Sequence, residues 1–444
     1  MADFSIRVAS VDDAPLLADI ERDADQRYLD SPYREQLDGS AIPAEAARRY
    51  CAEGRIFVAE VDGLVVGYLG WHLEADPDYL GISQVSVLTE FGRQGIGTAL
   101  MRRAVDTAIA KGVSHIVLAT FSDVAWNEPW YLRLGFRSLA PSDWTDWMRA
   151  IVDEQRGDVP WEHRVWMQLD VEMLQGGVAN AGAVARVGAE VHRPSNPHSA
   201  AIHRLLIHVR DAGFDGASQP VDIDPNGGER LVFVEGEVPL PPFPDWAQTD
   251  RALASTARLI RGLHDASVGF DASDADWSQE MADRDANPAT DDHRDRVVMC
   301  HNDVCMENIV FRDGAAVALL DFDFAAPGRR AHDLAAFARM CVPIDDDQGA
   351  ALLGWHRADR PHRLAVIADA YGLDGDQREE LLACLGATIA RGGEFVLRRV
   401  EAGEQPFIDM WESMGGMARF DRRRDWWATA RSGFAMALGV PSPA

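Results

Sequence analysis

Hydrophobic and polar positions follow two different periods in the first part of the chain. Residues 11–21 have a polar start and then apolar residues at helical spacing, which predicts a helix. Residues 56–61 and 64–71 alternate on either side of Asp62-Gly63, a turn pair that predicts a β-hairpin. Further strands are predicted at 82–88, 113–120 and 164–169, and a further helix at 99–108. This part of the chain therefore predicts a mixed α/β fold.

A second series of elements begins after residue 175. Residues 176–194 alternate around glycines and predict a hairpin that opens a new domain, and residues 200–210 predict a helix. The acidic stretch 271–296 has no periodicity and predicts a loop or insertion. Because 444 residues are too many for one ordinary core, we expect two domains, at residues 1–172 and 173–444.

Composition and charge narrow the class of protein. With 47% hydrophobic and 26% charged residues and no apolar run of about 18 residues, the chain is expected to be soluble, with no membrane partner. No secretory signal is visible, and five scattered cysteines suit a reducing, cytoplasmic location. A net charge of −28 argues against a nucleic-acid partner and would attract a cationic small substrate. Most of this negative charge is expected to serve solubility alone.

A glycine-rich turn between a predicted strand and a predicted helix is the first candidate site. It spans residues 89–98 and contains Gly92, Gly95 and Gly97. Glycines let the backbone approach a ligand closely, and the exposed N–H groups at the start of a helix bind phosphate. A plain connector between the two elements stays open as the alternative.

The order of elements resembles the GNAT family of N-acetyltransferases over roughly residues 4–170. The glycine-rich turn follows the fourth strand, and Asn127 and Tyr131-x-x-x-Gly135-Phe136 come after it in family order. The resemblance implies acetyl-CoA as cosubstrate and Tyr131 as the general acid toward the sulfur. One departure is Gly92, which stands where the family often has arginine or glutamine. The residues implied to bind coenzyme A are Val87, Leu88, Arg93, Gln94, Gly95, Ile96, Gly97, Thr98 and Asn127.

The base that deprotonates the acceptor amine is left open by the sequence. The candidates are Glu21, Glu74, Asp76 and Asp78, and an ordinary surface role is the alternative for each. The tryptophans of this half are expected to be core residues; they are Trp126, Trp130, Trp144 and Trp147.

The second half carries a polar motif, His-x-Asp-x-x-x-x-Asn, at residues 301–308. Asp303 can accept a proton from a substrate hydroxyl, while Asn308 and Asp321 supply hard oxygen ligands for Mg²⁺ on nucleotide phosphates. With Asp333 downstream, the pattern resembles the aminoglycoside phosphotransferase branch of the kinase-like fold over roughly residues 176–440. The resemblance implies ATP or GTP as cosubstrate and a bilobal fold.

The nucleotide-binding part departs from that family. Lys111 is the only lysine in the chain, so the usual strand lysine is missing, and we expect Arg193 to stand in for it. The helix at 200–210 contains no glutamate to hold Arg193. Because arginine is bulkier and forked, either phosphate binding is rebuilt around Arg193 or nucleotide affinity is reduced or lost. Other residues are expected to be ordinary or core residues rather than metal ligands: His192, His198, His203, His208, Cys300, His301 and Cys305.

Taken together, the two halves resemble the bifunctional aminoglycoside-modifying enzymes. The expected fold class is α/β (α+β), with a GNAT fold around a mixed central sheet and a C-terminal bilobal kinase-like fold. Three hypotheses follow: an enzyme that modifies an amine and a hydroxyl of an aminoglycoside, an acetyltransferase joined to an inactive lobe, and an enzyme of cellular amines or alcohols. Acidic residues that could line a cationic-substrate site are Glu394, Glu401, Glu404, Asp409 and Glu412.

Overall fold

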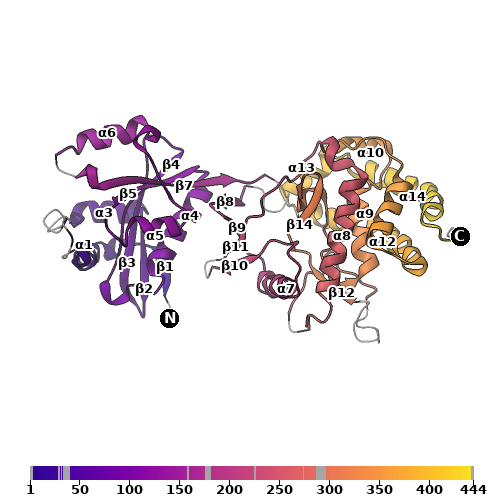
Figure 1. Cartoon of the computed structure of the whole chain (residues 1–444), viewed down its shortest axis with the longest axis horizontal. Helices are drawn as coiled ribbons and strands as arrows, with labels where there is room; N and C mark the ends of the chain where they lie inside the picture. The colour runs from indigo at the N-terminus through magenta and orange to yellow at the C-terminus, as the bar shows by residue number, and fades with distance from the viewer. Residues whose placement is uncertain are drawn as a thin grey trace. The chain divides into compact units, whose positions relative to one another are not determined.

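The computed structural model divides the chain into two compact units (Figure 1). The first comprises Met1–Leu174 and Gly182–Val191, and the second Gln175–Ala181 and His192–Ala444. The structure describes residues 4–28, 31, 33, 41–157, 160–175, 182–224, 227–273, 275–286 and 297–441. The start of the predicted hairpin, at 176–181, and the end of the predicted acidic loop, at 287–296, lie outside the described residues. A domain boundary after residue 172 stays a prediction.

The first unit is built on a mixed sheet, as the sequence predicts. Its elements are β1 (Ser5–Val8), η1 (Val11–Asp13), α1 (Ala14–Asp25), η2 (Gln26–Tyr28), α3 (Ala44–Ala52), β2 (Ile56–Val61), β3 (Leu64–Leu73), β4 (Tyr79–Val87), η3 (Thr89–Phe91), α4 (Ile96–Lys111), β5 (His115–Phe121), α5 (Glu128–Arg133), β6 (Arg137–Ser138), η4 (Pro141–Asp143), α6 (Asp146–Glu154), η5 (Trp161–His163), β7 (Arg164–Met173) and β8 (Ala185–Val187). Strands β1 to β4 are antiparallel neighbours, β4 and β5 are parallel, and β5, β7 and β8 are antiparallel.

Alternation along β2 explains how helices cover both faces of this sheet. Phe57 and Ala59 pack into one core with α4, whose buried residues recur every three or four positions. Ile56 and Val58 point the other way, into a core with α1 and α3. The predicted hairpin is confirmed, since Asp62 and Gly63 both have positive φ, as a two-residue turn of this kind requires.

The second unit joins a few short strands to a helical body. Its elements are β9 (Glu190–Pro194), which leads into it, α7 (Ser199–Asp211), β10 (Pro220–Ile223), β11 (Gly228–Val232), η6 (Asp245–Gln248), α8 (Asp250–Ala266), β12 (Val297–Cys300), η7 (Met306–Asn308), β13 (Ile309–Arg312), β14 (Ala315–Leu319), β15 (Ala326–Arg329), α9 (Arg330–Cys341), α10 (Asp347–Leu352), α11 (Arg360–Tyr371), α12 (Gly375–Glu401), α13 (Gln405–Ser413) and α14 (Gly416–Leu438). Strand β11 lies between β9 and β10. Helices α8, α9, α12 and α14 gather in the helical body (Figure 1).

Two short ladders position the polar motif of this unit. Strand β12 pairs with β15, and β13 pairs with β14, both antiparallel. Because the segment 301–308 connects β12 to β13, and 320–325 connects β14 to β15, the two connections meet beside the same pair of ladders. Hydrogen bonds from His301 to the Leu320 carbonyl and from Asn302 to the Phe324 carbonyl join them.

No helix within the described parts of the chain is long and apolar enough to cross a membrane.

Candidate acetyl-transfer and phosphoryl-transfer sites

The glycine-rich turn of the first unit has the geometry of an anion cradle. Gly95 is the N-cap residue of α4. Its φ of +91° is in the left-handed region, which favours glycine. A Cβ atom at position 97 would lie 3.3 Å from the Trp130 ring. This position in the first turn of α4 therefore has room only for a small residue. The N–H groups of the first turn of α4 have no partner within the helix and can bind a phosphate.

Strands β4 and β5 separate where they approach this turn. Within the described length of both strands, their parallel ladder consists of three residue pairs. They join residues 79–81 of β4 to residues 115–117 of β5. Beyond it, β4 continues to Val87 and β5 to Phe121. Their facing backbone edges are therefore free to bond an extended, amide-bearing ligand, and the pantetheine arm of coenzyme A is such a ligand.

Tyr131 lies in α5, and Asn127 immediately precedes this helix in the connection from β5. Asn127 caps the helix and exchanges two hydrogen bonds with the Tyr28 hydroxyl, at 3.0 and 2.9 Å. Tyr131 packs against Trp130 and Phe136, and its hydroxyl has no hydrogen-bond partner among the described residues. Burial raises the pKa of Tyr131, so the phenol stays protonated and can donate a proton. Sequence reasoning missed Tyr28, since its link to Asn127 spans 99 residues.

The four base candidates have different surroundings. The Glu21 carboxylate is buried and accepts hydrogen bonds from the Tyr68 hydroxyl and the Ile42 amide, at 2.8 and 2.9 Å. Glu74 pairs with His72 at 3.1 Å. Asp76 and Asp78 lie in the turn between β3 and β4, where the Asp78 amide donates to the Asp76 carboxylate.

A fifth carboxylate, which sequence reasoning missed, lies one helical turn from Glu21. Asp25, at the end of α1, is half-buried, and burial together with the Glu21 charge raises its pKa to about 6. The end of α1 lies against the end of β4, because the Thr89 amide and hydroxyl both donate to Asp23. The end of α1 that carries Asp25 is thus held next to the connection that leads from β4 into the glycine-rich turn.

The predicted tryptophan core is partly wrong. Trp130 packs against the sheet core, and Trp144 and Trp147 pack around Trp166. Trp126 is 45% exposed, because it lies in the connection between β5 and α5 and belongs to neither element.

In the second unit, Asp333 of α9 holds the polar motif in place. Its carboxylate is fully buried and accepts the amides of His301 and Asn302 at 2.9 and 2.7 Å and the His264 ring at 2.9 Å. His264, Cys300 and Asp333 lie close enough to hold a metal ion. The hydrogen bonds already satisfy Asp333, and burial raises the pKa of the Cys300 thiol, so this cluster is structural.

Asp303 and Asn308 lie together on the loop that Asp333 holds. The side-chain Nδ2 of Asn308 donates to the backbone carbonyl of Asp303 at 2.9 Å and to its carboxylate at 3.1 Å. Burial and the Asp321 charge raise the pKa of Asp303, which suits a group that accepts a proton. Since Asn308 uses its N–H₂ group here, its carbonyl oxygen is left for a hard cation, and the Asp321 carboxylate is 35% exposed. This donor set fits Mg²⁺.

Arg193 of β9 lies in the same site and is nearly buried. Its Nε atom is 3.2 Å from Glu229 of β11, Nη1 is 3.0 Å from Asp321, and Nη2 pairs with Asp323. His203 of α7 bonds the other Glu229 oxygen at 2.8 Å. As expected from the sequence, α7 has no glutamate beside Arg193; the nearby glutamate, Glu229, comes from β11, and α7 contacts it through His203.

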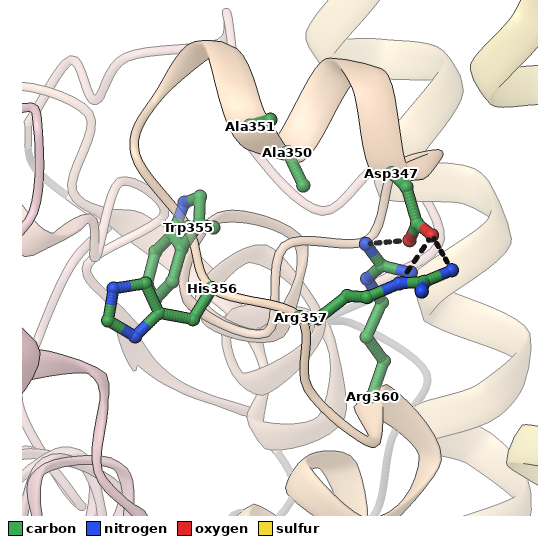
Figure 2. A pocket seen from close by; sticks show the side chains of 7 residues that line it. All are labelled: Asp347, Ala350, Ala351, Trp355, His356, Arg357 and Arg360. Atoms are coloured by element: carbon green, nitrogen blue, oxygen red, sulfur yellow. Dashed lines mark hydrogen bonds and ion pairs between the residues drawn. The ribbon is translucent and has the colours of Figure 1, made fainter.

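A pocket of about 380 Å³ lies elsewhere in the helical body (Figure 2). Trp355 and His356 stand on one side of it, and Asp347 binds Arg357 and Arg360 at 3.0 and 2.9 Å on the other. One carboxylate thus pairs with both arginines, and none of the predicted site residues lines the pocket. The acidic residues of α12 and α13 are mostly exposed, and Glu404 pairs with Arg399.

Comparison with known proteins assigns each half separately. Residues 16–136 match the acetyltransferase (GNAT) family, and residues 184–381 match the phosphotransferase enzyme family. The trifolitoxin immunity protein of Rhizobium leguminosarum bv. trifolii is 32% identical over 198 residues, which are 44% of this chain and 72% of that protein.

Solved structures similar to the chain include two that contain coenzyme A. The N-acetylglutamate synthase of Neisseria gonorrhoeae is 17% identical, with a TM-score of 0.31 over 38% of this chain and 35% of that chain. The PaiA N-acetyltransferase of Thermoplasma acidophilum is 15% identical, with a TM-score of 0.30 over 37% of this chain and 98% of that chain. From its two family matches, the chain is a transferase that belongs to the GNAT acetyltransferase family in its first half and to the phosphotransferase enzyme family in its second.

Proposed function

We propose that the chain acetylates an amine and phosphorylates a hydroxyl of small cationic compounds of the aminoglycoside type, in a cytoplasmic setting. The observation that carries this proposal is that each unit holds its own set of reacting groups: Tyr131 near an open helix start, and Asp303 with Asn308 and Asp321 on two adjacent connections. The net charge of −28 favours the approach of a cationic acceptor.

In the acetyl-transfer half, a neutral amine attacks the thioester carbonyl of acetyl-CoA. The nitrogen gives up one proton to solvent, the carbon–sulfur bond breaks, and the thiolate leaves with the electron pair. Tyr131 donates its proton to the sulfur and regains one from solvent. The start of α4 would hold the pyrophosphate through the amides near Gly95 and Thr98, and Asn127 would lie near the pantetheine arm. The raised pKa of Tyr131 supports this role, because a phenolate has no proton to give.

In the phosphoryl-transfer half, Asp303 accepts the proton of the substrate hydroxyl as the hydroxyl oxygen attacks the terminal phosphorus of the nucleotide. The bond from that phosphorus to the bridging oxygen breaks, and the nucleoside diphosphate leaves with the electron pair. Asn308 and Asp321 would hold Mg²⁺, which offsets the negative charge of the phosphates when bound. The buried carboxylate of Asp333 keeps the loop in position throughout, since it bonds two consecutive amides of that loop.

The test is mass spectrometry of an aminoglycoside panel incubated with acetyl-CoA alone, and separately with Mg·ATP or Mg·GTP. We expect a gain of one acetyl group in the first reaction and one phosphoryl group in the second. Tyr131→Phe should lower the acetylation rate by about 100-fold with unchanged acetyl-CoA affinity, and Asp303→Asn should abolish phosphorylation alone. No mass gain with either donor would contradict the aminoglycoside assignment and direct the search to cellular amines and alcohols.

One observation favours a second candidate function, an acetyltransferase whose C-terminal lobe only binds ligands. The Arg193 guanidinium is bonded to the same Asp321 carboxylate that would hold the metal. In that case, acetylated products would form and no phosphorylated product would be detected with either nucleotide.

A further inference from the structure

An arginine without an acidic partner lies beside the acetyl-transfer site. Arg164 begins β7, and its Nη2 atom donates to the Ala119 carbonyl of β5 at 2.8 Å. Its Nε atom is closed off from solvent, and among the described residues no acceptor bonds that atom and no carboxylate pairs with the guanidinium. The chain has 71 acidic and 43 basic residues, so a shortage of acids does not explain why this cation is unpaired.

Aromatic rings connect Arg164 to the residues that surround Tyr131. Arg164 and Phe121 lie opposite each other in the antiparallel ladder of β5 and β7, and the guanidinium carbon is 5.3 Å from the centre of the Phe121 ring. The Phe121 and Tyr28 rings are 6.2 Å apart between centroids. The Tyr28 hydroxyl is bonded to Asn127, whose backbone carbonyl accepts the Tyr131 amide at 3.3 Å. The cation and the two phenols therefore belong to one cluster near the end of β5.

The charge of Arg164 acts on the hydroxyl groups of this cluster. Burial raises the pKa of Tyr131, the neighbouring Tyr28 adds to that rise, and Arg164 opposes it. Burial raises the pKa of Tyr28 as well, and the Asp25 charge adds to that rise. Burial also lowers the pKa of Arg164, because removal from water disfavours its charged form. A cation that loses hydration without gaining an ion pair destabilises the resting protein.

We propose that Arg164 is a positioning residue of the acetyl-transfer site, and that its uncompensated charge stabilises the phenolate that Tyr131 becomes. The inference rests on the proposed role of Tyr131 as the acid. As the O–H bond of Tyr131 breaks, the proton forms an S–H bond with the thiolate, and the phenol oxygen keeps the electron pair. A fixed cation stabilises that new charge more than the neutral phenol, so it lowers the barrier. A carboxylate paired with Arg164 would cancel this effect.

The direct test measures how readily the phenol at position 131 ionises. The full chain is made with difluorotyrosine at that position and titrated by fluorine NMR, because fluorine lowers the pKa of the phenol toward the range in which proteins stay folded. Arg164→Gln should lower the ionisation constant about 10-fold, and Arg164→Lys, which keeps the charge, should leave it within about 2-fold. Arg137→Gln is the control, since Arg137 is an exposed arginine of the neighbouring β6 that pairs with Asp170.

A second measurement links this charge to catalysis. With an aminoglycoside that gains an acetyl group, Arg164→Gln should lower kcat about 10-fold and leave KM for acetyl-CoA unchanged. In a Tyr131→Phe background the same substitution should cause no further loss, because no phenolate forms there. A merely structural role of Arg164 would lower kcat equally in both backgrounds, and that result would overturn the inference.

The outcomes separate the inference from the proposed function. An ionisation constant that Arg164→Gln leaves unchanged overturns the inference, whether or not an acceptor has been found. If the ionisation constant falls and no aminoglycoside is acetylated, the electrostatic role stands and the aminoglycoside assignment fails. If Tyr131→Phe acetylates at the full rate, the role of Tyr131 fails and the inference fails with it. Should Arg164→Gln not fold, Arg164→Met takes its place, since it removes the charge and keeps an unbranched side chain.

Discussion

At the scale of single residues, the surroundings of a carboxylate decide what it can do. Glu21 and Asp25 are one turn apart on α1. The first is engaged by Tyr68 and Ile42, whereas the second has no hydrogen-bond partner within the described residues. Burial and the Glu21 charge raise the pKa of Asp25 to about 6, which is suitable for a base that works near neutral pH.

Asp25 also makes the stability of the first unit depend on pH. Because its folded pKa of about 6 is above its usual value of 3.8, the folded state binds more protons between these values, and stability falls as pH rises through them. Asp25→Asn should therefore unfold at a higher temperature than the unmodified chain, by a margin that grows from pH 5 to pH 7. Thermal unfolding across that range measures it. Asp19→Asn, on the exposed side of α1, should leave the profile unchanged; an identical profile in Asp25→Asn would contradict the assignment.

At the scale of elements, helix α12 contains glycines that packing requires. A Cβ atom at Gly393 would be 1.8 Å from a ring carbon of Phe420 in α14, and one at Gly392 would be 2.5 Å from the Arg339 guanidinium. Glycine costs a helix about 1 kcal/mol relative to alanine, so close helix contact outweighs propensity at these positions. Gly386, in the same helix, has only an ordinary contact, with Trp427 at 3.5 Å.

Substitution by alanine should change the free energy of unfolding in opposite directions at Gly393 and Gly386. Gly393→Ala should lower the free energy of unfolding by about 1–3 kcal/mol, because Phe420 must move. Gly386→Ala should raise it by up to about 1 kcal/mol, because the gain in helix propensity meets no clash. Urea unfolding followed by circular dichroism compares them. A stabilised Gly393→Ala would show that α12 and α14 do not pack as described.

At the scale of the whole molecule, the two units have separate hydrophobic cores. The core around Leu100 and Leu69 draws only on the first unit, and the core around Phe337 and Leu364 only on the second. Each core can therefore melt with its own cooperativity.

Calorimetry of the full chain should show two unfolding transitions, each sensitive to one cosubstrate. Acetyl-CoA at 100 times its Kd stabilises the state that binds it by about 2.7 kcal/mol, which corresponds to roughly 5–10 °C for a unit of this size. We expect it to shift one transition and Mg·ATP or Mg·GTP to shift the other. Adenosine is the control for the phosphate contribution. A single transition that both ligands shift together would contradict independent units.

The sequence by itself determined the local elements and the reactive residue types. Periodicity predicted α4 and the β2–β3 hairpin because side-chain spacing along a helix or strand is a local property. The spacing of Asp303 and Asn308 predicted that the two residues share one loop, and their side chains are hydrogen-bonded there. Only the tertiary structure decided which distant groups meet: Tyr28 with Asn127, and Arg193 with Glu229 and His203. Such partners depend on strand order and on how helices pack against the sheet, which no local pattern encodes.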